Sequence, residues 1–150
     1  MKVLILPFVL LWLGVSAQSD AVRLKEFNLD DNVALEGYDP VSFFTGKPVE
    51  GDDDIAYTHK GVTYHFSTAA NLSKFKSSPE GYEPAYGGWC AYAMGNTGEK
   101  VKIDPETYKI ISGKLYLFYN FWGNNTLETW NESESSLRAR ADQNWKKIVP

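Results

Sequence analysis

The residues best suited to chemistry in this sequence are a lone thiol, a thioether and two imidazoles. Cys90 is the one cysteine of the chain, so it has no partner for an intrachain disulfide. Met94 follows four residues later, and a helical turn there would place both sulfur atoms on one side. Thiolate, thioether and imidazole ligands together favour copper, above all Cu(I), over magnesium or calcium. The sequence therefore predicts a copper site centred on Cys90 and Met94, completed by His59 or His65.

Aromatic side chains form a second candidate site. Residues 79–98 combine glycines and prolines with large rings, and loops of this composition often carry binding sites. Tyr86, Trp89 and Tyr92, joined by Trp122, are the candidate residues. The alternative hypothesis is therefore a metal-free binding module, whose aromatic patch takes a small apolar ligand or a protein partner.

The lone cysteine leaves two further interpretations open. Cys90 is a candidate for thiol redox chemistry, in which it is oxidised or forms a mixed disulfide with another protein. It is equally suited to be a small buried residue that only packs. A Cys–His nucleophile pair is formally available, but no nucleophile elbow and no phosphate-binding glycine loop surround it. We expect binding rather than catalysis.

The N-terminus is typical of a secretory signal peptide. A charged start precedes an apolar run over residues 3–13, and small residues lead up to Ala17. The run is too short to cross a bilayer, which takes about 20 apolar residues. We therefore expect a signal peptide over residues 1–17, a leader over 18–32 and one domain over 33–150. The mature protein is expected to be secreted or periplasmic.

Composition restricts the partners of this domain. The chain of 150 residues has a formal net charge of −4 and no cluster of basic residues, which excludes nucleic acid as an expected partner. No second long apolar run follows the signal peptide, so no stable membrane insertion is expected after its removal. A metal ion or a small ligand remains the expected partner.

Local patterns predict an α+β fold. Alternating residues on both sides of Lys60-Gly61 predict a β-hairpin over 55–59 and 62–66, which sends His59 and His65 to opposite faces. Short strands over 100–103, 108–111 and 114–119 predict an antiparallel meander. Helices are expected after Asp39, after Thr68 and over 137–148, where apolar residues recur at helical spacing.

Four segments of the sequence resemble exported members of the YHS-domain family. They are residues 37–44, 61–67, 86–92 and 113–117, which occur in the family's order. The resemblance implies a small α+β domain and metal binding through cysteines, with no established reaction. Cysteine-rich relatives have several cysteines, whereas this chain has Cys90 alone, which disfavours a structural zinc site with four protein ligands. The family-like string Tyr64-His65-Phe66 favours His65 as the third copper ligand.

Overall fold

A computed structural model describes residues 19–150, and the predicted signal peptide lies outside this range. The elements in chain order are α1 (Asp20–Glu26), β1 (Leu29–Asp30), β2 (Val33–Ala34), the 3₁₀ helices η1 (Leu35–Gly37) and η2 (Ser42–Thr45), β3 (Asp52–His59), β4 (Val62–Phe66), α2 (Ala69–Ser77), α3 (Pro79–Tyr82), η3 (Ala85–Gly88), α4 (Ala91–Asn96), β5 (Asp104–Ile111), β6 (Lys114–Phe118), β7 (Asn120–Phe121), β8 (Asn124–Asn125), α5 (Thr126–Glu132) and α6 (Glu134–Ile148). The α+β prediction is confirmed.

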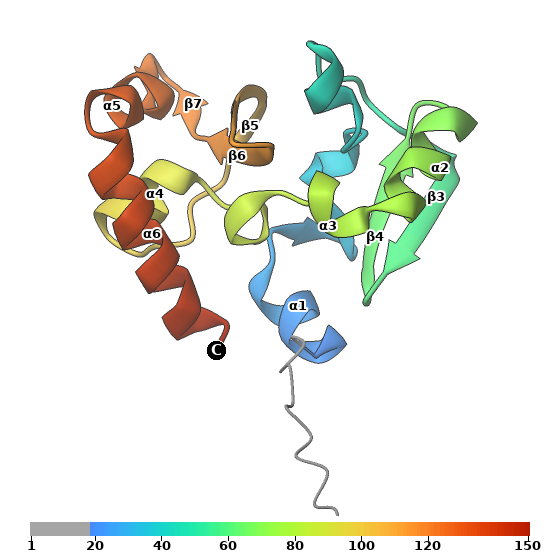
Figure 1. Ribbon diagram of the computed structural model, residues 1–150, viewed down its shortest axis with the longest axis horizontal. Coiled ribbons are helices and arrows are strands. Elements are labelled where there is room, and N and C mark those ends of the chain that lie inside the picture. Colours follow the sequence, from blue (N-terminus) through green and yellow to red (C-terminus); the bar gives the residue numbers. More distant parts are fainter. Residues whose placement is uncertain (1–18) are drawn as a thin grey trace, which may run out of the picture.

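Two lobes make up the fold (Figure 1). One lobe holds a sheet of strand order β1-β2-β4-β3, packed against α2. The other holds α4, α5 and α6 beside the β5–β6 pair. Helices α1 and α3 and the chain around η3 lie between them. The buried apolar side chains form two clusters, and β6 contributes to both, with Leu115 and Leu117 in one and Tyr116 and Phe118 in the other.

The β3–β4 hairpin forms as predicted. Its register pairs His59 with Val62 and Tyr57 with Tyr64, which places these four side chains on one face, while His65 lies opposite Ala56. Phe75 of α2 packs against this face, with its ring 4.7 Å from that of Tyr64. The sequence was therefore sufficient to separate the two histidines.

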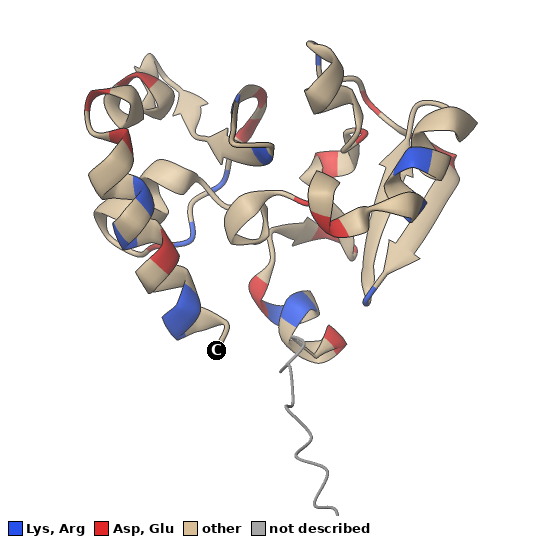
Figure 2. Cartoon of the chain, in the orientation of Figure 1, with Lys and Arg blue, Asp and Glu red and all other residues tan. Residues whose placement is uncertain are grey.

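Two predicted helices are present as well. Thr68 caps α2, since its hydroxyl accepts a hydrogen bond from the backbone N–H of Asn71. In α6, Leu137 and Ala141 are buried on the face that the four-residue spacing indicated. The charged side chains on these and the other elements are scattered and of both signs (Figure 2), and no helix within residues 19–150 is long and apolar enough to span a bilayer.

Two expectations for the first part of the chain differ from the structure. The predicted leader is part of the fold, because residues 20–26 form α1, and Arg23, Phe27 and Asn28 are buried. The helix expected after Asp39 is only the 3₁₀ turn η2, and it ends at Gly46, whose φ is +103°.

The antiparallel meander has two strands instead of three. Residues 100–103 form no strand, although the carbonyl of Val101 accepts the N–H of Cys90. Residues 104–107, which separate two of the predicted strands, form a bulge inside β5. Its cause is the Asp104 carboxylate, which accepts hydrogen bonds from the Glu106 N–H and the Thr107 hydroxyl and bends the strand.

Candidate functional site

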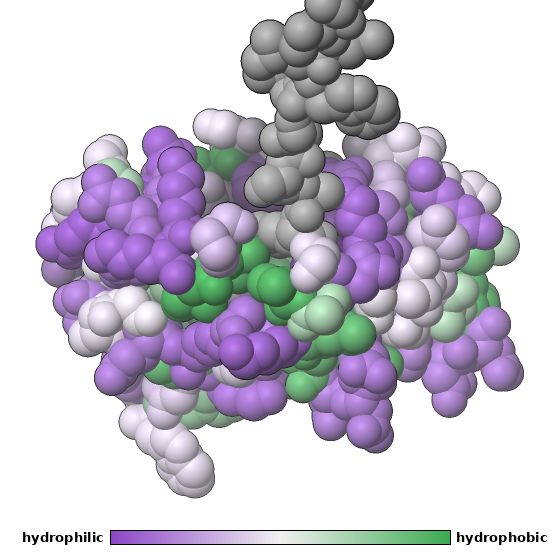
Figure 3. Space-filling model, turned by 90° about the horizontal axis from the view of Figure 1, so that it is seen from below, coloured by the Kyte–Doolittle hydropathy of each residue, from purple (hydrophilic) through white to green (hydrophobic). Residues whose placement is uncertain are grey.

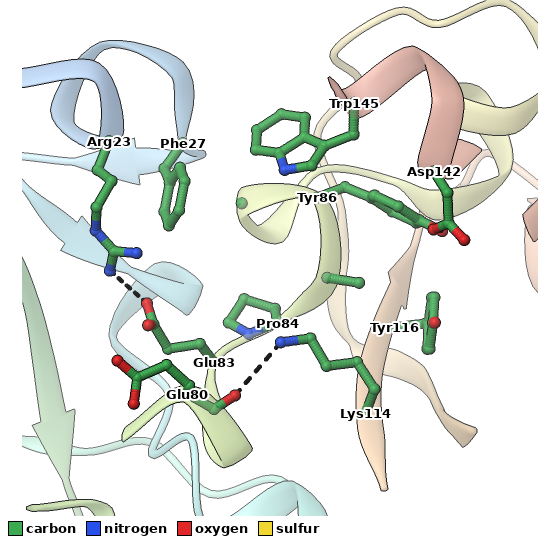
Figure 4. Close-up of a pocket in the computed structure, with 12 residues that line it drawn as sticks. Arg23, Phe27, Glu80, Glu83, Pro84, Tyr86, Lys114, Tyr116, Asp142 and Trp145 are labelled. Carbon is green, nitrogen blue, oxygen red and sulfur yellow. Dashed lines mark hydrogen bonds and ion pairs between the residues drawn. The ribbon is translucent and has the colours of Figure 1, made fainter. Parts of the chain in front are cut away.

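A pocket of about 340 Å³ lies between the two lobes (Figure 4). Its walls come from α1, from the chain around α3 and η3, from β6 and from α6. The lining residues are Arg23, Phe27, Glu80, Glu83, Pro84, Ala85, Tyr86, Gly87, Lys114, Tyr116, Asp142 and Trp145. Seen from the side of α1, apolar side chains gather in the middle of this face between hydrophilic flanks (Figure 3). The pocket therefore joins segments that are up to 122 residues apart in sequence.

A buried carboxylate network forms one wall. Glu83 is 5% exposed, and its Oε2 accepts hydrogen bonds of 2.5 Å from the Arg23 guanidinium and from the Tyr64 hydroxyl. Arg23 is fixed further by its bond to the Lys60 carbonyl oxygen and by stacking 4.6 Å above the Phe27 ring centre. Burial, followed by the Glu83 charge, raises the pKa of Tyr64 well above its usual value. Tyr64 therefore stays a hydrogen-bond donor.

The floor of the pocket depends on a glycine in a left-handed conformation. Gly87 has a φ of +59°, and a Cβ atom there would lie 2.7 Å from the Phe27 ring and 2.9 Å from Trp145. These two rings, 5.9 Å apart, meet above the glycine. Tyr86 precedes it with a φ of +54°, which few non-glycine residues adopt. The close approach of the two rings explains why this position excludes a side chain.

Lys114 brings an unmatched positive charge to the pocket. Its ammonium group points toward the α3 wall, where its one hydrogen bond is a long contact of 3.4 Å to the Glu80 carbonyl oxygen. Over residues 19–150, no carboxylate lies within 4.0 Å of this Nζ atom. Burial lowers the pKa of Lys114, and this effect exceeds the opposing attraction of Glu83 and Glu80.

The remaining charges around the pocket are matched by neighbours. Arg23 pairs with Glu83, and the Glu80 carboxylate accepts a hydrogen bond of 3.0 Å from Lys60. This bond lowers the pKa of Glu80 to about 2. At the rim, the exposed Asp142 accepts a 2.8 Å hydrogen bond from the Tyr86 hydroxyl. Of the two cationic side chains that line the pocket, Lys114 is thus the one without a close carboxylate.

The predicted copper ligands lie in three different surroundings. Cys90 is fully buried in the cluster that contains Phe75 and Leu117, and Met94 is buried in the cluster that contains Trp130. His65 lines a separate hollow of about 510 Å³, together with acidic side chains such as Glu36 and Glu50. The structure does not bring these three residues together, and the copper site stays a prediction.

The sulfur of Cys90 already has polar neighbours. The Tyr119 N–H donates to Sγ at 3.3 Å, and the Thr126 hydroxyl oxygen lies 3.5 Å from Sγ. Because the Thr126 hydroxyl donates its own proton to the Tyr119 carbonyl oxygen, it faces the sulfur as an acceptor. Both the donor and the acceptor capacity of a thiol are therefore used.

The predicted aromatic residues do not form a single patch. Tyr86 lines the pocket between the lobes, whereas Tyr92 lines a separate hollow of about 290 Å³ beside Cys90. The Trp89 indole N–H donates to the Glu26 carbonyl oxygen at 2.6 Å, so this side chain ties α1 to the domain. Trp122 is 98% exposed in the β7–β8 turn. Of the four, Tyr86 alone contributes to the pocket.

Comparisons with known proteins add no assignment to this geometry. No protein-family model, no curated protein and no solved structure matches the chain. Membership of the YHS-domain family therefore stays a prediction, and the function must be argued from the site.

Sequence reasoning missed most residues of the pocket. Arg23 was assigned to a leader, and Lys114 was part of a strand with no marked role. One local signal was present: Glu80 and Glu83 are three residues apart behind Pro79, which starts a helical turn and places both on one side. No local pattern connects them with Lys114.

Proposed function

We propose that this domain binds a small organic anion with an apolar body in the pocket between its lobes. Lys114 holds the anionic group, and the rings of Phe27 and Trp145 hold the apolar part. The single observation that carries the proposal is the partly buried ammonium group of Lys114, which borders an aromatic pocket and has, within residues 19–150, no carboxylate within 4.0 Å of its Nζ atom. Such a group has a free-energy cost in the empty protein, which an anionic ligand offsets.

The size and lining of the pocket support this class of ligand. Ligand pockets usually measure about 300–1,000 Å³ and combine apolar walls with a few placed polar groups. At about 340 Å³ this pocket is at the lower limit of that range, which suits a small carboxylate rather than a lipid or a peptide. Since the N-terminal sequence predicts export, we propose that the ligand is met outside the cytoplasm.

The charge pattern argues against a cationic ligand at this position. Arg23 and Lys114 both border the pocket, and Oε2 of Glu83 already accepts hydrogen bonds from Arg23 and Tyr64. Within residues 19–150 no carboxylate lies within 4.0 Å of the Lys114 Nζ atom, so a cation placed beside this ammonium group would meet repulsion and no ion-pair partner there. An anion finds the Nζ atom with hydrogen-bonding capacity to spare, because its one present bond is long.

Ligand-observed NMR with matched carboxylates and amides tests the proposal. Short aliphatic and aromatic carboxylates are expected to bind, and their neutral amides to bind about 10- to 100-fold more weakly, since a charge-assisted hydrogen bond contributes about 1.5–3 kcal/mol. Lys114→Met should remove this difference. Lys47→Met, at an exposed lysine, is the matched control and should leave it unchanged.

Two results would contradict the proposal. One is equal binding of carboxylates and amides by the wild type. The other is unchanged discrimination in Lys114→Met, which would place the anion elsewhere on the protein.

A further inference from the structure

Three potential metal ligands meet where the β3–β4 hairpin approaches α3. His59 is the last residue of β3, and its Nε2 lies 3.1 Å from Oε1 of Glu80 and 3.9 Å from Oε1 of Glu83. One ligand atom of each residue lies within 4.8 Å of the others. Figure 4 shows the two glutamates side by side on the α3 wall of the pocket. We propose that His59, Glu80 and Glu83 bind a divalent metal ion, with Zn²⁺ as the best-fitting probe.

The distances suit a tetrahedral ion. Zinc bonds to nitrogen and oxygen of about 2.0–2.2 Å place two ligand atoms of a tetrahedron about 3.3 Å apart. The two measured separations from His59 lie on either side of this value. A shift of less than about 1 Å would therefore bring all three ligand atoms into coordination.

Glu83 provides an independent indication of a ligand. Its side chain is 7% exposed, and within residues 19–150 only Oε2 takes part in hydrogen bonds. Oε1 faces His59 with no donor at hydrogen-bonding distance. Arg23 and Tyr64 hold the other oxygen, as outer hydrogen bonds do for metal-ligating carboxylates. A buried carboxylate is thus oriented with one oxygen left free.

The imidazole is oriented as well. The His59 ring meets Phe75 edge-on, at 6.3 Å between ring centres and an interplanar angle of 85°. Its side chain is 14% exposed, so the ring has limited freedom to turn away. Packing of α2 against the hairpin thus holds Nε2 toward the two glutamates.

The chemistry of the ligand set favours a borderline divalent ion. One imidazole and two carboxylates suit Zn²⁺ better than Cu(I), which prefers thiolate and thioether sulfur. Two carboxylates also neutralise the charge of the ion. Because Glu80 and Glu83 line the pocket, a fourth coordination position would face it and take water.

Lys60 competes for the same site. Its Nζ donates to Oε1 of Glu80 at 3.0 Å, and its side chain is 44% exposed, so it can move into solvent when the ion binds. Removal of this cation should strengthen metal binding. If Glu80 serves only as the salt-bridge partner of Lys60, the substitution of Lys60 will not increase the affinity for the metal ion.

Calorimetric titration of the purified protein with Zn²⁺ alone tests the proposal. We expect one ion per chain, at least a tenfold loss of affinity in His59→Gln and in Glu80→Gln, and a gain in Lys60→Met. Cys90→Ser and Asp53→Asn are the controls and should bind as the wild type does. Asp53 belongs to the exposed Asp52–Asp54 group, which could also gather an ion.

Glu83→Gln is left out of this series because loss of the buried charge threatens folding, and the two more accessible ligands are substituted instead. The proposal is overturned if neither the wild type nor Lys60→Met takes up Zn²⁺. It is equally overturned if His59→Gln and Glu80→Gln bind unchanged, or if the loss occurs in Cys90→Ser or Asp53→Asn. Lys114→Met should still take up one Zn²⁺ ion per chain although it loses the preference for carboxylates, so a failure of the metal proposal can be told apart from a failure of the anion proposal.

Discussion

Cys90 and Lys114 are held at opposite ends of the same strand, and their surroundings differ in how well they are matched. Cys90 forms a bridge with Leu117 near the end of β6, and its sulfur has both a donor and an acceptor. Lys114 begins β6, and no carboxylate among residues 19–150 forms an ion pair with it. Cys90, which the sequence analysis selected, thus has partners for its thiol group. Lys114, which the sequence analysis did not select, has no ion-pair partner among the described residues. This contrast is the basis of the packing role that we expect for Cys90 and of the binding role that we propose for Lys114.

The largest expected effect comes from breaking the network behind Lys114. Arg23→Met should lower the free energy of unfolding by about 3–5 kcal/mol, because Glu83 would remain buried without its cation. Chemical denaturation followed by circular dichroism measures this loss. Lys25→Met on the same helix is the control, since its side chain is 82% exposed and should change stability by less than about 0.5 kcal/mol. A small effect of Arg23→Met would mean that water enters and solvates the Glu83 carboxylate in place of the guanidinium group.

Replacement of Cys90 should also destabilise the protein. Cys90→Ala removes a fully buried sulfur and should cost about 1–2 kcal/mol of unfolding free energy, measured in the same denaturation experiment. The assignment of packing to Cys90 and of binding to Lys114 would be wrong if the wild type took up one Cu(I) ion per chain and Cys90→Ser abolished this uptake. Cys90 would then be the functional residue that the sequence predicted.

Replacement of Lys114 should have the opposite sign. Lys114→Met removes a partly buried ammonium group and keeps its apolar length, so we expect a gain of up to about 1 kcal/mol in unfolding free energy. If Lys114→Met both stabilises the protein and loses carboxylate binding, the role of Lys114 is to bind a ligand and not to stabilise the fold. A loss of stability would place Lys114 with Cys90 as a structural residue.

The pH dependence of anion binding sharpens the role of Lys114. Since burial lowers its pKa, the ammonium loses its proton at a lower pH than a free lysine, whose pKa is about 10.4. Carboxylate affinity should therefore fall as pH rises through this lowered pKa, with the decline beginning before an exposed lysine titrates. Calorimetric titrations from neutral to alkaline pH follow the decline, which is expected to be absent from the residual binding of Lys114→Met.

The smallest expected effect concerns acid stability at Glu80. Its pKa of about 2 is lower than the ordinary 4.5, so its contribution is present above about pH 4.5 and lost as pH falls toward 2. Glu80→Gln should lack this part of the acid dependence, which urea melts between pH 2 and 5 would show. Because the side chain is 63% exposed, we expect a difference below about 1 kcal/mol.

The features that the sequence predicted correctly depend on neighbours along the chain. The β3–β4 hairpin follows from alternation around Lys60-Gly61, α2 from its Thr68 cap, and the buried face of α6 from four-residue spacing. Turn chemistry was less decisive. The Asp104 carboxylate makes the hydrogen bonds of a turn, yet pairing with β6 continues on both sides of it.

The pocket could not be predicted in the same way. Its charge balance depends on Arg23 meeting Glu83 and on Lys114 meeting no carboxylate, and both are results of tertiary packing. The composition of residues 79–98 predicts a site-forming loop, and Tyr86 within it does line the pocket. What this composition could not reveal is that Phe27, from the segment assigned to a leader, closes over Gly87.

The pocket takes one wall from the first helix of the described chain and another from the last. During synthesis α6 emerges from the ribosome after the other walls, so a nascent chain has no complete pocket until then and cannot retain the proposed anion. The pocket would therefore form empty, and its occupancy would report only on the solution in which the chain completes its fold.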